Sequence, residues 1–171
     1  MNSREAWEFL NATLDNIFSQ LPSYFQVEPL VVIQFGSSLN GHLKPASDID
    51  LLFIFHELPR SRKERFALTE SFENALSPVL KKLDQEGYHY DVSPLLRSRD
   101  ALHVFSGLYL DMVEHSRIAF DPHRLGADLL ERTKRFMERN QSKKVFLKGK
   151  PVWFYKTGMK FGERFDESQP F

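Results

Sequence analysis

Two aspartates open an apolar run in the segment QFGSSLNGHLKPASDIDLLFIF, which covers residues 34–55. The run LLFIF predicts a buried strand, and a carboxylate is costly to bury without a partner. Side chains alternate along a strand, so Asp48 and Asp50 point the same way while Ile49 points into the core. This pair therefore suits either the solvated mouth of a strand or a bound cation such as Mg²⁺, which takes oxygen ligands.

A Gly-Ser pair lies ten residues before these aspartates. Gly36 and Ser37 follow the apolar run 29–35, which predicts another buried strand. A strand that ends in Gly-Ser and leads into a helical turn presents backbone N–H groups and a hydroxyl to an anion. Gly and Ser also favour an ordinary turn, so neither half of the pattern is specific by itself.

The complete pattern is far more specific than its halves. Gly36-Ser37, ten residues and then Asp48-Ile49-Asp50 resemble the signature of the nucleotidyltransferase superfamily that includes DNA polymerase beta. The minimal prokaryotic type is the most similar, and the resemblance covers about residues 25–100, with a further similar stretch at 107–121. It implies an α/β (α+β) nucleotidyltransferase fold, in which helices pack on a small mixed sheet.

The resemblance also implies roles for the acidic residues. Asp48 and Asp50 would be catalytic metal ligands for Mg²⁺ or Mn²⁺, and a third carboxylate would lie on a neighbouring strand. Asp91 is the expected third ligand, because it lies mid-strand after a long helix; Glu86 is the alternative. Two ions held in this way would stabilise both the attacking and the leaving oxygen atoms.

Nucleotide binding is implied for the residues around the loop. Gly36 and Ser37 would hold the β- and γ-phosphates, and Ser47 stands before the first aspartate as it does in the family. Asn40 occupies a position where members often carry a basic residue. We expect Lys44 to supply the missing positive charge.

The implied reaction moves a nucleoside monophosphate from a nucleoside triphosphate, expected to be ATP, to an acceptor hydroxyl. A protein, a small molecule or an RNA end could present that hydroxyl. Small members often act beside a helical protein as the antitoxin of a toxin–antitoxin pair, so a helical partner is also expected. The rival hypothesis is a non-catalytic module that uses the same fold to neutralise a helical partner by contact.

Apolar spacing predicts the remaining elements. We expect one helix at 61–84, with its apolar stripe at Phe66, Leu68, Phe72, Leu76, Leu80 and Leu83 and a kink at Pro78. The other predicted helices are 3–20, 99–115 with a break at Gly107, and 123–140. The other predicted strands are 29–35, 48–55, 87–96 and 117–120, with a hairpin at 144–155 and a loosely held tail from Lys156.

Composition places these elements in one soluble domain of 171 residues, with a core at about 25–100 and an extension at about 101–171. The chain has no cysteine, no predicted membrane helix and no signal-peptide pattern, which favours the cytoplasm. Residues 132–164 hold 11 Lys and Arg against two Glu, whereas residues 1–131 hold 12 Lys and Arg against 19 Asp and Glu. This basic segment suits either a solvated face or a surface that attracts phosphates or an acidic partner. The extra C-terminal helix and hairpin could supply an acceptor site or a homodimer surface.

Overall fold

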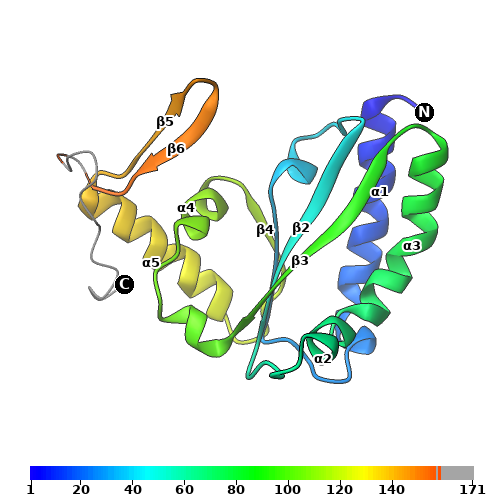
Figure 1. The fold of residues 1–171 in the computed structure, drawn as a ribbon, viewed down its shortest axis with the longest axis horizontal. Helices are drawn as coiled ribbons and strands as arrows, with labels where there is room; N and C mark the ends of the chain where they lie inside the picture. The colour runs from blue at the N-terminus through cyan, green and yellow to red at the C-terminus, as the bar shows by residue number, and fades with distance from the viewer. Residues whose placement is uncertain (157, 159–171) are drawn as a thin grey trace.

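A four-stranded mixed sheet and a separate two-stranded hairpin organise the computed structural model, which describes residues 1–156 and 158 (Figure 1). The strand order in the sheet is β3-β2-β1-β4. The strands are β1 (Val31–Phe35), β2 (Ala46–Phe55), β3 (His89–Ser98) and β4 (Ser116–Phe120). The predicted α/β class and the predicted mixed sheet are confirmed.

The pairing directions make the sheet mixed. Strand β1 runs antiparallel to both β2 and β4, while β2 and β3 are parallel. The parallel connection passes through α2 (Arg62–Ala67) and α3 (Glu70–Gln85), as a crossover between parallel strands requires. The three strands predicted around the motif are therefore neighbours in space. The fourth strand comes from residues 116–120, beyond the range expected for the core.

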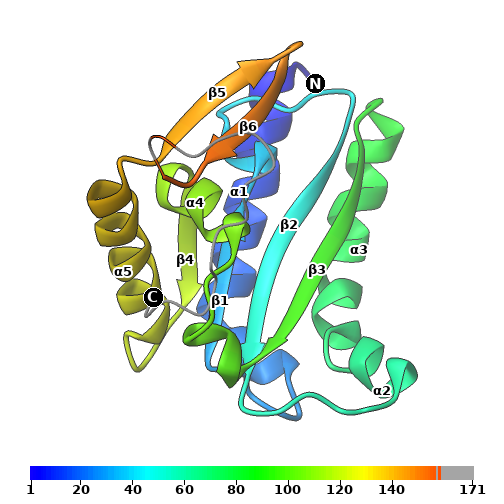
Figure 2. The same cartoon turned by 60° about the vertical axis from the view of Figure 1, so that its left-hand side comes forward.

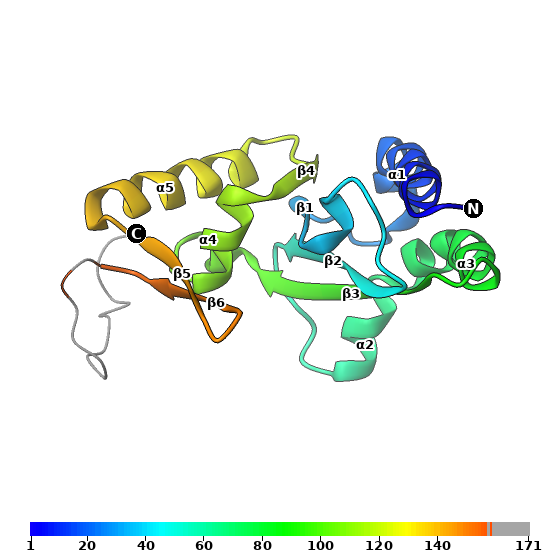
Figure 3. The same ribbon diagram turned by 90° about the horizontal axis from the view of Figure 1, so that it is seen from above.

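Helices cover both faces of the sheet, as Figure 3 shows. One face packs on α1 (Ser3–Ser19) and α3. The other packs on α4 (Gly107–Glu114) and α5 (Leu125–Asn140). Strand alternation sends Ile49, Leu51, Phe53 and Phe55 into the first core and Leu52 and Ile54 into the second. Because both faces of β2 are buried from Leu51 onward, its sequence is continuously apolar there.

Helix α1 is fixed at both its start and its inner face. The Asn2 side chain accepts from the Arg4 and Glu5 amides, and the Glu5 carboxylate accepts from the Asn2 amide, which completes a capping box. Buried apolar side chains recur at helical spacing along one face: Ala6, Leu10, Leu14, Ile17 and Phe18. The helix predicted at 3–20 is confirmed.

The single helix predicted at 61–84 is wrong, because the chain forms two helices there (Figure 2). Helix α2 has no buried residue, so packing does not hold it in line with α3, and Phe66 is 56% exposed. The break comes at buried Thr69, whose hydroxyl donates to Glu73 at 2.6 Å in the first turn of α3. Pro78 lies inside α3 on its exposed side, where water can satisfy the carbonyl that proline leaves without a donor.

The C-terminal elements follow the predictions closely. The region 99–115 is a 3₁₀ turn, Arg99–Leu102, followed by α4, which begins at Gly107. Strands β5 (Lys143–Leu147) and β6 (Lys150–Phe154) form the predicted hairpin, with Lys148 and Gly149 at positive φ in the turn. Two more 3₁₀ turns cover Leu21–Tyr24 and Ser37–Leu39. The tail predicted from Lys156 lies almost wholly outside the described residues.

Within residues 1–156 and 158, no helix is long and apolar enough to cross a membrane.

Candidate active site

Register brings the three predicted aspartates onto one face of the sheet. Asp48 is the Cα partner of Asp91 across the parallel β2–β3 pair, and Asp50 is the partner of Ser93. Paired residues point to the same face, so Asp91 shares a face with Asp48 and Asp50. Asp48 and Asp91 are exposed there, and Asp50 is partly buried. The aspartates therefore occupy the end of the face that the second core leaves open.

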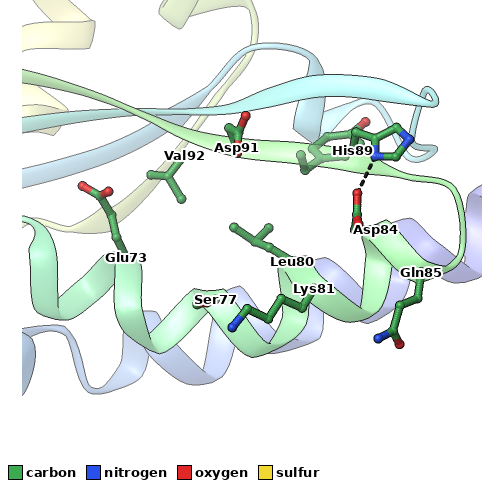
Figure 4. A pocket seen from close by; sticks show the side chains of 10 residues that line it. Glu73, Ser77, Leu80, Lys81, Asp84, Gln85, His89, Asp91 and Val92 are labelled. Atoms are coloured by element: carbon green, nitrogen blue, oxygen red, sulfur yellow. Dashed lines mark hydrogen bonds and ion pairs between the residues drawn. The ribbon is translucent and has the colours of Figure 1, made fainter.

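The side-chain view agrees with this register. In Figure 4, Val92 points toward α3 and Asp91 points away from it, to the opposite side of β3. Val92 packs against the first core, and Leu95 further along β3 packs against the second. Asp91 therefore lies on the sheet face that carries α4 and α5, upstream of the point where those helices cover it.

Asp50 is held between the two neighbouring strands. On the β1 side, a Cβ atom built on Gly36 would lie 2.3 Å from Oδ2 of Asp50. On the β3 side, Ser93 is the register partner of Asp50. Burial and the nearby Asp48 charge raise the pKa of Asp50, and the Ser93 hydroxyl opposes that rise. Asp50 is thus a positioned carboxylate whose charge is not fully compensated by its surroundings.

The Gly36-Ser37 loop is a 3₁₀ turn that several elements hold in place. Gly36 has φ of 81° and ψ of −163°, a conformation open to glycine but not to other residues without strain. Buried Ser38 accepts from Gln34 Nε2 at 3.0 Å through its hydroxyl and from Trp7 Nε1 at 2.9 Å through its carbonyl. The loop thus sits rigidly at the end of β1, beside Asp50.

Gln34 also connects the loop to a polar network that reaches β4 and α1. Its Oε1 atom accepts two hydrogen bonds from Arg117 of β4, at 3.1 Å and 2.6 Å, and Arg117 pairs with Asp15 of α1. Gln34 is fully buried, so these bonds satisfy a group that would otherwise be costly to bury. No local sequence pattern marks this network, because its members are separated by up to 102 residues.

Ser47 lies on the other face of β2 from the aspartates. It shares that face with Ile49, and Tyr90 is its register partner on β3. The Ser47 hydroxyl bonds to that of Ser37 and so joins the loop to the start of β2. The structure therefore places Ser47 as a support for Ser37, and its predicted contact with nucleotide stays a prediction.

Lys44 lies in the exposed loop before β2. Its amide donates to the Tyr90 hydroxyl at 3.1 Å, and its side chain is exposed. The structure thus places Lys44 near the entrance of β2 without joining its ammonium group to the aspartates. Asn40 is exposed in the same loop.

Glu86, the alternative third carboxylate, is placed elsewhere. It follows the C-terminus of α3 and accepts from the N-terminal ammonium group of Met1 at 2.7 Å. That hydrogen bond and charge lower the pKa of the Glu86 carboxyl. Of the two candidates, Asp91 is the one in register with Asp48.

Asp48 and Asp50 form a pair of carboxylates that suits a bound cation. Among the described residues, no group of three or more His, Cys, Asp and Glu side chains is arranged to hold a metal ion. Mg²⁺ commonly uses one or two carboxylates together with substrate phosphates, and Asp48 and Asp50 meet that requirement on one face. Burial is the larger cause of the raised pKa of Asp50, and the Asp48 charge is the second. Asp91 as a metal ligand remains a prediction.

A groove of about 800 Å³ runs along the outer edge of the sheet, between α3 and β3 (Figure 4). Its lining includes Leu80, Val92 and Asp91, and the His89 imidazole contacts the Asp84 carboxylate at its rim. This groove reaches the site at Asp91, but most of its lining lies on the α3 side of β3. Sequence reasoning missed both the groove and Ser93, which lies two residues after Asp91.

Comparison with known proteins decides the family. A model of the nucleotidyltransferase domain matches residues 14–120, which contain every predicted site residue. The chain belongs to this nucleotidyltransferase family. The predicted family and the predicted nucleotidyl-transfer activity are confirmed, and the matched region is wider than the residues 25–100 expected from the motif.

One curated relative of this nucleotidyltransferase comes from Methanocaldococcus jannaschii and is named "Putative protein adenylyltransferase MJ1305". It is 27% identical over 148 residues, which cover 85% of this chain and 94% of the relative. The similarity thus extends beyond the family domain into the C-terminal extension.

Two solved structures are similar at lower levels. A toxin–antitoxin structure with AMP-PNP has 15% identity and a TM-score of 0.45, covering 74% of this nucleotidyltransferase and 92% of that chain. A tri-AMPylated HEPN toxin in complex with an MNT antitoxin, from Shewanella oneidensis, has 12% identity and a TM-score of 0.40, covering 77% and 92%. Because both TM-scores lie below 0.5, neither likeness adds to the assignment.

Proposed function

We propose that this nucleotidyltransferase moves AMP from ATP to a hydroxyl group of a protein, with Mg²⁺ or Mn²⁺ as its cofactor. The proposal rests on the open face of the sheet. On this face Asp50 lies beside the Gly36 loop, and Asp48 is the register partner of Asp91. The name of the Methanocaldococcus jannaschii relative supports both AMP as the transferred group and protein as the acceptor.

The loop and the aspartates have complementary roles in this reaction. Gly36 and Ser37 bind the β- and γ-phosphates, and Lys44 adds positive charge from the loop before β2. Asp48 and Asp50 hold the divalent cation, which when bound neutralises charge on the triphosphate and on the departing pyrophosphate. Ser93, the register partner of Asp50, favours its ionised carboxylate. Catalysis is then mainly positioning and neutralisation of charge.

Asp91 has the position of a proton acceptor for the incoming hydroxyl. It is exposed and is the register partner of Asp48. The acceptor oxygen forms a bond to the α-phosphorus, the bond from that phosphorus to the bridging oxygen breaks, and pyrophosphate leaves. Asp91 takes the hydroxyl proton, which balances the step.

The position of the label in ATP provides the test. Purified protein is incubated with Mg²⁺, a cleared cell extract and ATP labelled either at the α- or at the γ-phosphate. We expect α-label, and no γ-label, in a protease-sensitive product. The Asp48→Asn and Asp50→Asn variants should label nothing while keeping the wild-type circular dichroism spectrum.

Other outcomes separate the rival hypotheses. Transfer of γ-label would mean phosphoryl transfer and contradict the proposal. Nuclease-sensitive product would replace protein by RNA as the acceptor. Nucleotide binding with no labelled product would support the non-catalytic binding module. The antitoxin role that the family resemblance implies remains a prediction.

A further inference from the structure

Strand β3 forms one edge of the four-stranded sheet (Figure 2). Among the described residues, no strand pairs with its outer side. Its register with β2 is unbroken from His89 to Ser98, and the His89 amide donates to the Pro45 carbonyl at 2.8 Å. Alternate residues of a strand make the bonds to a parallel neighbour. The odd-numbered residues of β3 therefore bond to β2, and the even-numbered residues direct their backbone groups to the open edge.

Pro94 limits the length of this open edge. It is an even-numbered residue, so its missing amide costs the sheet no hydrogen bond, and strand prolines are normally found at such edge positions. A proline on an edge also opposes long pairing with another strand. Before Pro94, Tyr90 and Val92 keep amides that point outward. The free segment is therefore short, and these two residues lie on either side of Asp91.

This short segment coincides with the candidate active site. The Asp91 side chain shares a sheet face with Asp48, while its backbone bonds to β2. A strand added at the edge would place one residue opposite Asp91, on the same face and with the two Cβ atoms about 5 Å apart. A Ser, Thr or Tyr at that position would present its hydroxyl beside the carboxylate that is proposed to take its proton.

The groove between α3 and β3 would receive the side chains on either side of that hydroxyl residue. These side chains point to the opposite face of the sheet, where most of the groove lining lies. Leu80 and Val92 supply apolar lining, and Figure 4 shows both side chains between the helix and the strand. Three carboxylates and the single ammonium group of Lys81 also line the groove. This acidic lining repels a phosphate backbone and favours apolar or basic side chains, so a peptide fits it better than RNA.

We infer that an extended segment of the acceptor protein adds to the sheet as a strand along β3, with its acceptor residue opposite Asp91. Free backbone groups at a sheet edge recognise an extended peptide through main-chain hydrogen bonds. The short pairing that Pro94 allows suits a substrate that must leave after the reaction, and it disfavours a second copy paired edge to edge. This inference rests on the proposed transfer to a protein hydroxyl and adds how that protein is held.

A peptide and its two N-methylated forms test the inference. The fluorescent peptide has about nine residues, with Tyr at its centre, Val on either side of the Tyr and Arg toward both ends. Successive amides of an extended strand point to opposite sides, so each form methylates one alternate set. Fluorescence anisotropy with the Asp50→Asn protein measures binding without transfer. One form should bind as the unmodified peptide does, and the other at least about tenfold more weakly, because its methyl groups block the bonds to β3.

Proline variants locate the binding. Val92→Pro removes an amide that points to the open edge next to Asp91, and it should weaken peptide binding at least about tenfold. Leu96→Pro is the matched control, because Leu96 is also even-numbered, partly buried and packed on the first core, but lies beyond Pro94. It should bind the peptide normally. Thermal melting must show that both variants are folded, and if one is not, the two N-methylated forms still decide the outcome.

Transfer is tested separately, with wild-type protein, Mg²⁺ and ATP labelled at the α-phosphate. The form that binds should take label on its central Tyr, and versions with Ser or Thr at the centre extend the test to the other hydroxyls. A version with Phe at the centre should bind and take no label. Binding in the expected pattern with no label in any version would uphold the docking strand and contradict the proposed transfer.

Four results would overturn the inference. Failure of the unmodified peptide to bind, or equal binding of the two N-methylated forms, would remove the role of main-chain bonds. Unchanged binding by Val92→Pro would place the peptide elsewhere. A wild-type dimer by light scattering that becomes monomeric in Val92→Pro would make a second copy the occupant. Binding of a fluorescent oligonucleotide that Val92→Pro abolishes would make this edge a nucleic-acid site.

Discussion

Gly36 and Asp50 fit together only because Gly36 has no side chain. An added Cβ would lie 2.3 Å from Oδ2 of Asp50, well inside van der Waals contact. Phe35, the residue before Gly36, is the register partner of Asp50 in the β1–β2 pair. The glycine of the Gly-Ser motif therefore has two functions, a positive φ and room for the carboxylate. Both functions explain the motif without reference to phosphate.

Gly36→Ala should separate these two functions when compared with Gly41→Ala. Both glycines have positive φ, 81° and 78°, but a Cβ on Gly41 would meet nothing within 4 Å. Each variant should lose about 1–2 kcal/mol of stability from backbone strain. Only Gly36→Ala should also displace Asp50, and a displacement of about 1 Å can reduce the rate about 100-fold. Denaturant unfolding and initial rates check this, and equal loss of activity in both variants would refute it.

Asp50→Asn should stabilise the metal-free protein. Burial and Asp48 raise the pKa of Asp50 above its ordinary value of 3.8. The folded protein thus binds this proton more tightly than the unfolded chain does, so ionised Asp50 costs stability above the raised pKa, and the cost disappears as pH falls below 3.8. With chelator at pH 8, the variant should melt at a higher temperature than wild type.

The pH dependence of the melting temperature tests whether ionised Asp50 causes this loss of stability. The difference in melting temperature should narrow as pH falls toward about 4, because wild-type Asp50 then becomes protonated. Asp48→Asn should also stabilise the metal-free protein, but less than Asp50→Asn does, because it removes only the repulsion between the two carboxylates. A variant that is less stable than wild type at pH 8 would instead give Asp50 a structural role.

Ser93→Ala should lower the rate by misplacing Asp50. The variant loses the hydroxyl that opposes the rise in the Asp50 pKa, so its pH–rate profile should shift toward higher pH. We expect kcat to fall about tenfold with little change in KM for ATP, and Ser93→Thr to restore most of the rate because it keeps the hydroxyl. If kcat and KM change in parallel and the pH–rate profile does not shift, Ser93 has only a structural role.

The sequence predicted most elements because their signals are local. Apolar spacing, the strand-ending Gly36 and the β-branched run before it are properties of short segments, and the corresponding helices and strands formed. The family resemblance also implied that Asp91 would lie on a strand next to that of Asp48 and Asp50, as it does. The break at Thr69 was missed because Pro78 is the stronger local signal, yet burial of the α3 face decided the outcome.

The site was harder to predict from the sequence, because the register between strands is set by tertiary contacts. The parallel pairing that puts Asp91 beside Asp48 also puts Ser93 beside Asp50, and nothing local marks Ser93. Strand alternation could have excluded Ser47 from the aspartate face, because it is adjacent to Asp48. The Gln34–Arg117 contact joins positions 83 residues apart and has no local signal.

The central claim is that Asp48 and Asp50 bind nucleotide through a divalent cation, and thermal shift with ATP tests it most directly. Ligands that bind only the folded state stabilise it by about 2.7 kcal/mol at a hundredfold excess over Kd, or roughly 5 °C or more for a chain of this size. ATP with Mg²⁺ should raise the melting temperature of wild type by this amount, whereas ATP with chelator should have little effect and Asp50→Asn should lose the rise. If ATP with chelator stabilises wild type as much as ATP with Mg²⁺, the aspartates do not act through a metal and the account is contradicted.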